Sequence, residues 1–360
     1  MQFIARTEDQ YPIWDDFCLT SDEAWFWHTS KWLGYCLLYG KEKFESRDIS
    51  FLVADNSGIL AICPLLLEKK TSPDGTFYFE FSTSGSNGPG IAPALRNGLT
   101  EDRYENVLKS IYERVDALAK EHNVVRGAFR TTPLAVYSPH NVFLKFGYLD
   151  STLNTQIIDL SIPTERLWGA LRKGHKYDTN RGEKNYRIHI YDRNNADKDC
   201  FDQYRLLHHK AAGRVTRPVK TFEMMYRWML DGEGMLCGVS QNDQFVGFSY
   251  ILLYKGGAYY ASASDDPDFE TNIPISHIIQ WKTIAWLKDK GFKIYEIGLQ
   301  QFSPQLYDIP TPKELSISFF KRGFGGKTVP LYRGFKYYDK NFMKEDLTVN
   351  LNNLLQQYLA

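Results

Sequence analysis

A short segment near the C-terminus places a lysine where it could stabilise negative charge. Lys321 follows Phe320 at the end of a short apolar run, and three glycines follow within the next five residues. An ammonium group at the end of a predicted helix could stabilise the oxyanion that forms when a nucleophile attacks a carbonyl carbon. The glycine spacing matches neither a P-loop nor a dinucleotide-binding fingerprint. The segment therefore predicts charge stabilisation by Lys321.

A second group of cationic and titratable side chains surrounds a predicted helix end. Gly213 suits the left-handed position after a helix, and Pro218 prevents the helix from continuing. Arginines at such a turn can bind carboxylate or phosphate, and a neighbouring histidine can act as a base for an amine or hydroxyl nucleophile. The alternative is that these cations only complement the helix dipole. The candidate residues are His208, His209, Arg214, Thr216 and Arg217.

The segment before residue 290 contains a third set of candidates. His277 lies at the start of a predicted helix over residues 275–290, whose N-terminus should lower its pKa and keep the ring neutral. A capping or packing role is the alternative. Tyr259 and Tyr260 lie in a predicted strand with small residues beyond them, which would allow a ligand to approach the backbone. We interpret the adjacent Asp265 and Asp266 as loop residues.

Basic residues are concentrated between positions 172 and 187 of a chain with 43 basic and 43 acidic side chains. Two short helices are predicted here, over residues 164–171 and about 176–185. The basic face could be merely solvated, or it could bind the phosphates of a nucleotide, a lipid carrier or RNA. The candidate ligand-binding residues are Arg172, Lys173, Lys176 and Arg181, with Lys31 near the N-terminus.

The elements that must position these side chains are predicted to occur in two copies. Residues 54–66 and 240–252 each indicate a strand, a polar turn containing asparagine and a second, more apolar strand. An amphipathic helix follows each hairpin, over residues 100–121 and 275–290, and a short strand follows each helix, over 124–130 and 293–297. Two copies of one α/β domain usually enclose a site between them. Chance resemblance is the alternative.

Apolar periodicity, glycines and prolines predict the remaining helices, strands and loops. The segment 30–39 is predicted to be a helix, 84–90 a glycine-rich loop, and 154–160 a strand. Further helices are expected over about 197–213 and 221–231, and a proline-containing loop over 299–312. Thr100 is the predicted N-cap of helix 100–121. The change of domain is expected near residue 150.

Composition excludes several classes of protein. A chain of 360 residues with balanced charge has room for two domains and no global field for nucleic acid. The five cysteines show no metal-ligand spacing and are expected to be reduced and buried. No apolar run approaches the ~20 residues of a membrane span, and residues 1–17 lack the apolar core of a secretory signal. We expect a cytoplasmic protein and leave peripheral membrane contact open.

Several of these segments together resemble the Fem-type, GNAT-like acyltransferases, which include the aminoacyl-tRNA-dependent enzymes that build peptidoglycan cross-bridges. The resemblance rests on the basic helix 173–184, on helix 276–291 followed by Tyr295-Glu296-Ile297-Gly298, and on Ile317 to Lys321 followed by Phe324-Gly325-Gly326. It implies an α/β (α+β) fold of two tandem GNAT-like domains, each a mixed twisted sheet flanked by helices. It also implies acyl transfer by Phe320 and Lys321.

The expected domains are residues 1–150, residues 151–326 with the active site, and a C-terminal helix over 340–360. The resemblance also implies that residues of about 327–345 complete the first domain. The expected reaction is N-acyl transfer to an amine of a cell-envelope, amino-sugar or secondary-metabolite precursor. Acyl-CoA or aminoacyl-tRNA would be a co-substrate, with no tightly bound cofactor, metal or DNA. No Arg-x-x-Gly-x-Gly pyrophosphate loop follows residues 258–264, so the donor stays open. The alternative is a non-catalytic protein that binds a nucleotide-sugar or an anionic peptide.

Overall fold

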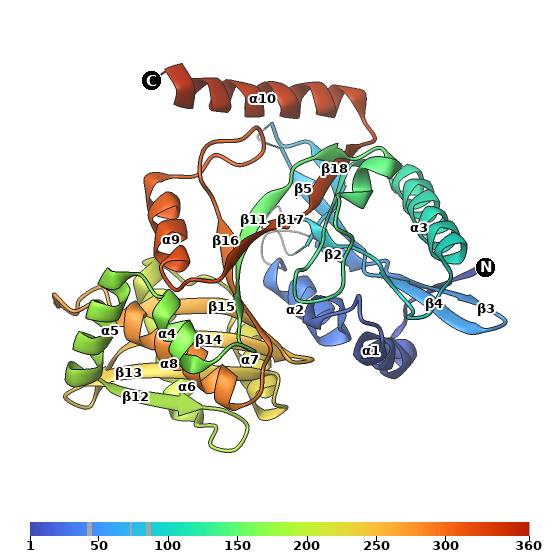
Figure 1. The fold of residues 1–360 in the computed structure, drawn as a ribbon. Helices are drawn as coiled ribbons and strands as arrows, with labels where there is room; N and C mark the ends of the chain where they lie inside the picture. Colours follow the sequence, from blue (N-terminus) through green and yellow to red (C-terminus); the bar gives the residue numbers. More distant parts are fainter. Residues whose placement is uncertain (42–44, 73, 84–87, 360) are drawn as a thin grey trace. The chain divides into compact units, whose positions relative to one another are not determined.

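The computed structural model describes residues 1–41, 45–72, 74–83 and 88–359 (Figure 1). The chain divides into two compact units. Unit 1 contains Met1–Asn154, Gln301–Pro312 and Pro330–Ala360, and unit 2 contains Thr155–Gln300 and Lys313–Val329. Most of the glycine-rich loop expected at 84–90 lies outside the described residues.

Unit 1 contains two sheets within its described residues. The first has the strand order β1-β3-β4-β8, and the second has the order β10-β18-β9-β6-β5-β2, with β7 also paired to β9. The strands are β1 Gln2–Ala5, β2 Glu45–Asp48, β3 Phe51–Asp55, β4 Gly58–Cys63, β5 Leu66–Thr71, β6 Phe77–Phe81, β7 Gly90–Ile91, β8 Ala94–Leu95, β9 Val124–Arg130, β10 Leu149–Asp150 and β18 Arg333–Tyr337. The α-helices are α1 Tyr11–Thr20, α2 Ser30–Tyr39, α3 Glu101–Glu121 and α10 Lys340–Leu359.

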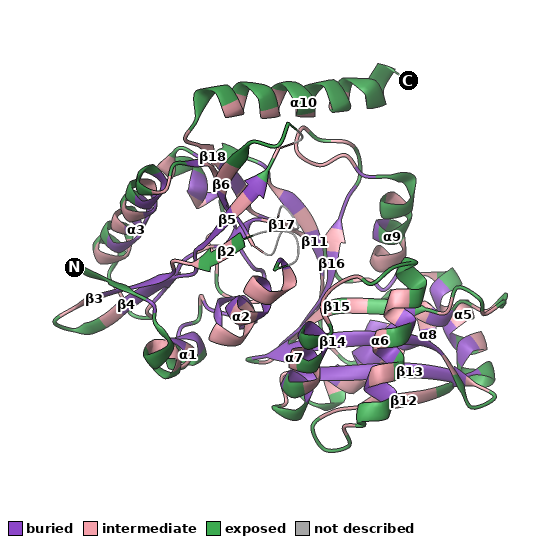
Figure 2. Ribbon diagram, turned by 180° about the vertical axis from the view of Figure 1, so that it is seen from behind, coloured by how far each residue is buried: buried purple, intermediate pink, exposed green. Residues whose placement is uncertain are grey.

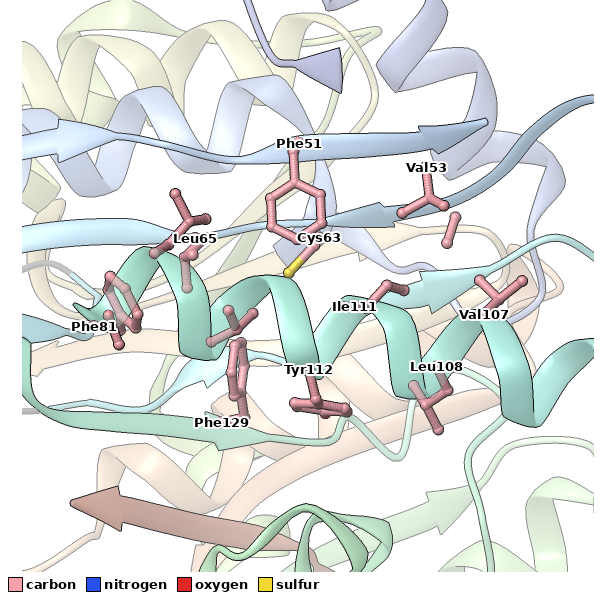
Figure 3. Close-up of a cluster of buried hydrophobic side chains, with 14 of the residues drawn as sticks. Phe51, Val53, Cys63, Leu65, Phe81, Val107, Leu108, Ile111, Tyr112 and Phe129 are labelled. Carbon is pink, nitrogen blue, oxygen red and sulfur yellow. The ribbon is translucent and has the colours of Figure 1, made fainter. Parts of the chain in front are cut away.

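Helix α3 organises the core of unit 1. The Thr100 side chain accepts a hydrogen bond from the Arg103 amide, and Glu101 and Asp102 complement the helix dipole in the first turn. One face of α3 is buried against the strands, as its apolar spacing predicts. Figure 3 shows Val107, Ile111 and Tyr112 pointing from α3 into this cluster. The predicted helix over 100–121 and its N-cap are therefore confirmed.

Both predicted hairpins are present. Strand β3 pairs antiparallel with β4 in unit 1, and β13 (Gly234–Gln241) pairs antiparallel with β14 (Gln244–Tyr254) in unit 2. Asn242 and Asp243 both have positive φ, as the tight turn between long twisted strands requires. The copies differ in topology, however. In unit 2 the hairpin shares one sheet with the strand after its helix, whereas in unit 1 the hairpin and β9 belong to different sheets.

Unit 2 is built on a mixed sheet with the order β12-β13-β14-β15-β16-β11-β17, counted over the described residues. Strand β15 runs antiparallel to β14 and parallel to β16. The other strands are β11 Leu153–Asp159, β12 Arg187–Tyr191, β15 Gly257–Asp265, β16 Ile294–Gln300 and β17 Lys327–Leu331. The helices are α4 Thr164–Ala170, α5 Lys173–Asn185, α6 Lys198–Ala212, α7 Val219–Leu230, α8 Ile275–Asp289 and α9 Pro312–Arg322.

Helices cover both faces of the unit 2 sheet, and β13 and β14 between them are almost wholly buried (Figure 2). On one face, Ile251 of β14 packs with Ile278 and Ile279 of α8. On the other face, the neighbouring Tyr250 donates a hydrogen bond to the Met225 carbonyl oxygen of α7 at 2.7 Å. Because successive strand residues point to opposite faces, α8 lies on one side of the sheet and α7 on the other.

The C-terminal part of the chain contributes to unit 1. Strand β18 pairs antiparallel with β9 and with β10. Helix α10 follows and has no buried residue; in Figure 2 its residues are exposed or intermediate.

The remaining expectations concern membranes, metals and cysteines. Within the described residues, no helix combines the length and apolar character that crossing a membrane requires. The same residues contain no group of three or more histidine, cysteine, aspartate or glutamate side chains placed to hold a metal ion. All five cysteine side chains are buried, as the sequence predicts.

Candidate active site

A pocket of about 400 Å³ opens in unit 2 between the end of β15, the start of α8 and one face of α9. It combines apolar walls with a lysine, a histidine, a tyrosine and an aspartate. The pocket is lined by Tyr260, Asp265, Pro274, Ile275, Ser276, His277, Ser316, Ile317, Phe320 and Lys321. Four residues that the sequence predicts to form the site therefore meet here: Tyr260, His277, Phe320 and Lys321.

Lys321 lies in the last turn of α9, where it lines the pocket and is partly buried. This burial lowers the pKa of Lys321 to about 8, although the nearby Glu296 carboxylate acts in the opposite direction. Glu296 is itself buried and accepts a hydrogen bond of 2.7 Å from the Thr155 hydroxyl group. The lysine Nζ also lies 6.0 Å from the centre of the Tyr260 ring. The ammonium charge is therefore held at the pocket with little solvation.

Gly298 makes room for this ammonium group. It has φ of +108°, and a Cβ atom at this position would lie 2.9 Å from Lys321 Nζ. Side chains are disfavoured at such φ values, and here one would also displace the lysine. Glycine at position 298 is thus required both by the backbone and by the site.

Replacing Gly298 with alanine should separate these two effects. We expect a loss of about 1 to 2 kcal/mol in the free energy of unfolding from backbone strain, and a fall in turnover from the displaced Lys321. The matched control is Gly256→Ala, because Gly256 has φ of +76° and open space where the Cβ would lie. Thermal unfolding should show a loss in both variants, and turnover should fall only in Gly298→Ala. Equal turnover in the two variants would contradict the role given to Gly298.

His277 is neutral at physiological pH. Burial is the main cause that lowers the pKa of His277 to about 4, and nearby His175 lowers it further. The direction is the one expected from the helix N-terminus, but the principal cause is desolvation. The buried Nδ1 atom of His277 has no hydrogen-bond partner among the described residues, and its ring packs edge-on against Phe320, with 4.9 Å between ring centroids. The ring can thus accept a proton only weakly.

His175 of α5 fixes the end of α9 that carries Lys321. Its Nε2 atom lies 2.9 Å from the Phe320 carbonyl oxygen, so it must carry the proton and donate. A Cβ atom on Gly323 would lie 2.0 Å from His175 Nε2, which explains one of the glycines after Lys321. His175 was not among the residues predicted from the sequence, because nothing local shows that α5 meets α9.

Three basic residues at and after the start of α5 contact α9, α4 and a loop. The Arg172 guanidinium group lies 3.7 Å from the centre of the Phe319 ring. Lys176 Nζ donates to the Gly169 carbonyl oxygen at 2.9 Å, and Arg181 donates to the Asn272 side chain at 3.1 Å. Lys173 is exposed at the start of the helix. Lys31 lies in α2 of unit 1 and does not line this pocket.

The cluster around Gly213 lies elsewhere in unit 2. Gly213 ends α6 in the left-handed conformation, as expected. Thr216 Oγ1 then lies 3.2 Å from His208 Nδ1 and 3.3 Å from His209 Nδ1. Burial, followed by the charge of Arg217, lowers the pKa of His208 to about 4.

This cluster belongs to the face of the sheet that α6 and α7 cover. Arg217 packs over Phe222 of α7, 4.2 Å from the ring centre, and Phe222 packs against Tyr204, which contacts Tyr250. Tyr259 also points to this face, because it precedes Tyr260 in β15. The structure therefore does not bring His208, His209, Thr216, Arg217 or Tyr259 to the pocket, and Arg214 is exposed in the loop.

Asp265 also lines the pocket, and the prediction that it is a loop residue is wrong: it is the last residue of β15. Ser276 lies in the first turn of α8, and its hydroxyl group donates a 2.8 Å hydrogen bond to Asp265 Oδ2. Asp265 is exposed as a residue, but the protein around its carboxylate partly desolvates it and raises its pKa, while the hydrogen bond from Ser276 opposes this change. The Asp265 charge in turn adds to the effect of burial in raising the pKa of Tyr260.

The pocket lies beside a mixed sheet, at the start of the helix that connects the parallel strands β15 and β16, and it contains a partly buried lysine. Residues 169–303 match the family model described as an acetyltransferase (GNAT) domain. This segment includes α5, the hairpin, β15, α8 and β16, and it ends before α9. No curated protein matches the chain in sequence.

Solved structures resemble the chain over nearly its whole length. The crystal structure of FemX is 11% identical with a TM-score of 0.64, and the match covers 96% of this chain and 99% of FemX. L-PGS from Bacillus licheniformis is 13% identical with a TM-score of 0.52, covering 90% of this chain and 92% of that one. A tandem GNAT protein from the clavulanic acid biosynthesis pathway is 9% identical with a TM-score of 0.51, covering 93% and 98%. The chain thus shares its fold with FemX and with a tandem GNAT protein, and its residues 169–303 match the GNAT acetyltransferase domain.

Proposed function

We propose that this protein transfers an acyl or aminoacyl group onto the amine of a cell-envelope, amino-sugar or secondary-metabolite precursor. The observation that carries the proposal is the position of Lys321, a desolvated cation in a pocket that also contains a neutral histidine. The fold shared with FemX and with a tandem GNAT protein of the clavulanic acid pathway, together with the GNAT domain match, supports the reaction class. The product of the reaction would be an amide.

Lys321 would stabilise the oxyanion of the tetrahedral intermediate. A preorganised charge in a poorly solvated pocket acts more strongly than it would in water, because few water dipoles compete with it. Phe320 and Ile317 would exclude water from the acyl group, since both line the pocket next to Lys321. This division of roles agrees with the part that the family resemblance assigns to Phe320 and Lys321.

The first turn of α8 favours an aminoacyl ester over acyl-CoA as the donor. In a GNAT domain that uses acyl-CoA, the amides at this helix start would be expected to bind the pyrophosphate. Here the Asp265 carboxylate accepts a hydrogen bond from Ser276 at that place, and Asp266, Asp268 and Glu270 follow in the same connection. Lys210 compensates part of this charge through its ion pairs with Asp266 and Asp268, but the Asp265 carboxylate at the helix start still disfavours a diphosphate there. We therefore propose aminoacyl-tRNA as the preferred donor and keep acyl-CoA as the other candidate.

Binding of tRNA would require exposed cations. Lys173 and Lys184 of α5 and Arg214 after α6 are exposed, so we propose these residues for contact with an anionic donor or acceptor. Both candidate donors occur in the cytoplasm, and we propose that the protein acts there. Contact with the inner face of the membrane would be needed only for a lipid-linked acceptor.

Mass spectrometry of reaction products tests the proposal. The purified chain would be incubated with acetyl-CoA or alanyl-tRNA and with amino-sugar and peptide amines. We expect an amide product with alanyl-tRNA, formed more slowly as salt is raised because phosphate contacts weaken. Tight binding of a nucleotide-sugar or anionic peptide without turnover of either donor would instead support the non-catalytic alternative.

A further inference from the structure

The end of β15 places a carboxylate in the same pocket as Lys321. Asp265 lines the pocket together with Tyr260 and His277, and its side chain is open to solvent. An acceptor that enters this pocket therefore meets both a negative and a positive side chain. The Fem-type resemblance and the domain match assign no role to this carboxylate.

The position of Asp265 is constrained from two sides. Ser276 holds one carboxylate oxygen through the hydrogen bond of 2.8 Å. On the neighbouring strand, Gly247 is paired with Asp265, and a Cβ atom there would lie 3.0 Å from the other oxygen, Oδ1. The same Cβ would lie 2.7 Å from Ile275 at the start of α8. The absence of a side chain at Gly247 thus leaves space for the carboxylate beside the helix.

We propose that Asp265 binds the ammonium group of the acceptor and accepts the proton that this group must lose before it attacks. This assignment rests on the proposed function. A carboxylate attracts an ammonium ion through a charge-assisted hydrogen bond. Neutral His277 lacks the charge to do so, and the raised pKa of Asp265 makes its carboxylate a better proton acceptor than an ordinary aspartate.

The proton and electron balance of the step is complete. One N–H bond of the ammonium group breaks and its proton passes to Asp265, which leaves a lone pair on nitrogen. The lone pair forms the C–N bond with the acyl carbon, and the carbonyl electrons move to the oxygen beside Lys321. When the carbonyl re-forms, the C–O or C–S bond to the donor breaks. The leaving oxygen or sulfur takes the second nitrogen proton, and Asp265 returns its proton to water.

Two nucleophiles distinguish this role from a structural one. Ethanolamine is an ammonium ion at neutral pH and must lose a proton before attack, whereas hydroxylamine is already neutral. For Asp265→Asn we expect transfer to ethanolamine to fall at least about 100-fold, with transfer to hydroxylamine changed only a few-fold. Hydroxylamine also reacts with such donors without a catalyst, so the rate without protein is subtracted; the protein-dependent remainder requires the folded pocket and shows that the variant folds. The matched control is Asp268→Asn, since Asp268 is exposed and paired with Lys210 at 3.0 Å.

A second variant tests the hydrogen bond that positions the carboxylate. Ser276→Ala should lower ethanolamine transfer by about 5-fold, the effect of one ordinary hydrogen bond, and should leave hydroxylamine transfer unchanged. It should also move the acidic limb of the ethanolamine pH profile upward, because Ser276 stabilises the carboxylate form. The other titratable groups that face Asp265 are Lys321, His277 and Tyr260, and all three remain in this variant.

The results with the two nucleophiles test the role of Asp265 separately from the proposed acyl transfer. Equal losses with both nucleophiles in Asp265→Asn, or a loss with neither, would overturn the role of Asp265 and leave the proposed function standing. A parent chain that transfers to neither nucleophile from alanyl-tRNA or acetyl-CoA would overturn the proposed function, and the role of Asp265 with it.

Discussion

Replacing Lys321 with methionine should lower turnover by about 10² to 10³-fold, the usual effect of removing one group that stabilises an oxyanion. The affinity for donor and acceptor should change far less, because the substrate carbonyl carries little charge before attack. Methionine has similar length and no charge, so the apolar contacts of the pocket are kept. The matched control is Lys313→Met, which removes an exposed lysine from the first turn of the same helix.

The same substitution should stabilise the folded chain. Folding lowers the pKa of Lys321 from 10.5 to about 8, so the folded state binds this proton less tightly than the unfolded state does. The buried charge therefore costs free energy at pH values below 8, and this cost disappears as the pH rises from 8 to 10.5. Allowing for partial solvation, Lys321→Met should gain about 1 to 3 kcal/mol near pH 7 and nothing above pH 10.5.

Denaturant unfolding at several pH values, combined with product formation by mass spectrometry, measures both effects. Turnover of the parent chain should also fall as the pH rises through 8, because Lys321 then loses its charge. A Lys321→Met variant that is less stable than the parent at pH 7, or one that keeps full turnover, would contradict the role of this lysine.

The largest loss of stability is expected in unit 1, from Lys70→Met. Lys70 is 3% exposed and lies between two buried carboxylates, 2.5 Å from Glu80 and 3.6 Å from Glu68. Arg126 also contacts Glu80, at 2.9 Å, and Asp346 of α10, at 2.8 Å. Without Lys70, the Glu68 carboxylate loses a buried positive partner. The expected loss is about 3 to 5 kcal/mol.

Lys69→Met is the control for this loss, because it makes the same change at the adjacent residue. The Lys69 ion pair with Glu45 is exposed and 3.4 Å long, so its removal should change the free energy of unfolding by at most about 1 kcal/mol. Hydrogen exchange of the β5 and β6 amides would report on unit 1 separately from unit 2. Similar effects of the two substitutions would show that the buried network contributes little.

The network and the active site illustrate different uses of buried charge. In unit 1, Lys70 and Arg126 are neutralised by carboxylates at short distances, and such groups chiefly specify the packing of the sheet and α10. In unit 2, the Lys321 charge is opposed only weakly, so desolvation dominates its pKa. A cation that is poorly compensated in the resting protein is better able to stabilise a negative charge that develops during reaction.

Most elements of the fold follow from local signals in the sequence. The predicted strand 124–130 has the bounds of β9, and helix 30–39 has those of α2. Helix 275–290 corresponds to α8, and helix 197–213 to α6 with Gly213 after its end. Such elements can be predicted because caps, turns and apolar periodicity act over a few residues. The division of the chain near residue 150 and the completion of the first domain stay predictions.

The composition of the site was only partly predictable. Lys321, Phe320, His277 and Tyr260 each lie near the end of an element, where the sequence pattern suggested chemistry, and they meet in one pocket. His208 and His209 showed an equally strong pattern, but α6 lies on the opposite face of the sheet from α8. No local signal states which face of a sheet a helix covers, because that choice depends on how the whole unit buries its apolar surfaces.

The side to which Asp265 points could not be predicted from local sequence either. Strict alternation from Tyr260 would direct Ser262 and Ser264 to the α8 face and Asp265 to the opposite one. The register shifts, however, because Ile251 pairs with Tyr260 whereas Tyr250 pairs with Ser262, which leaves Ala261 as an extra residue. Asp265 then pairs with Gly247 and faces α8.

The sequence by itself thus determined the hairpins, the helices and the lysine at the end of α9, because short-range periodicity and turn chemistry specify them. Only the tertiary structure decided that Asp265 and His175 join this lysine and that His208 and His209 do not. The physical reason is that a β-bulge and the packing of helices on a sheet depend on partners distant in sequence.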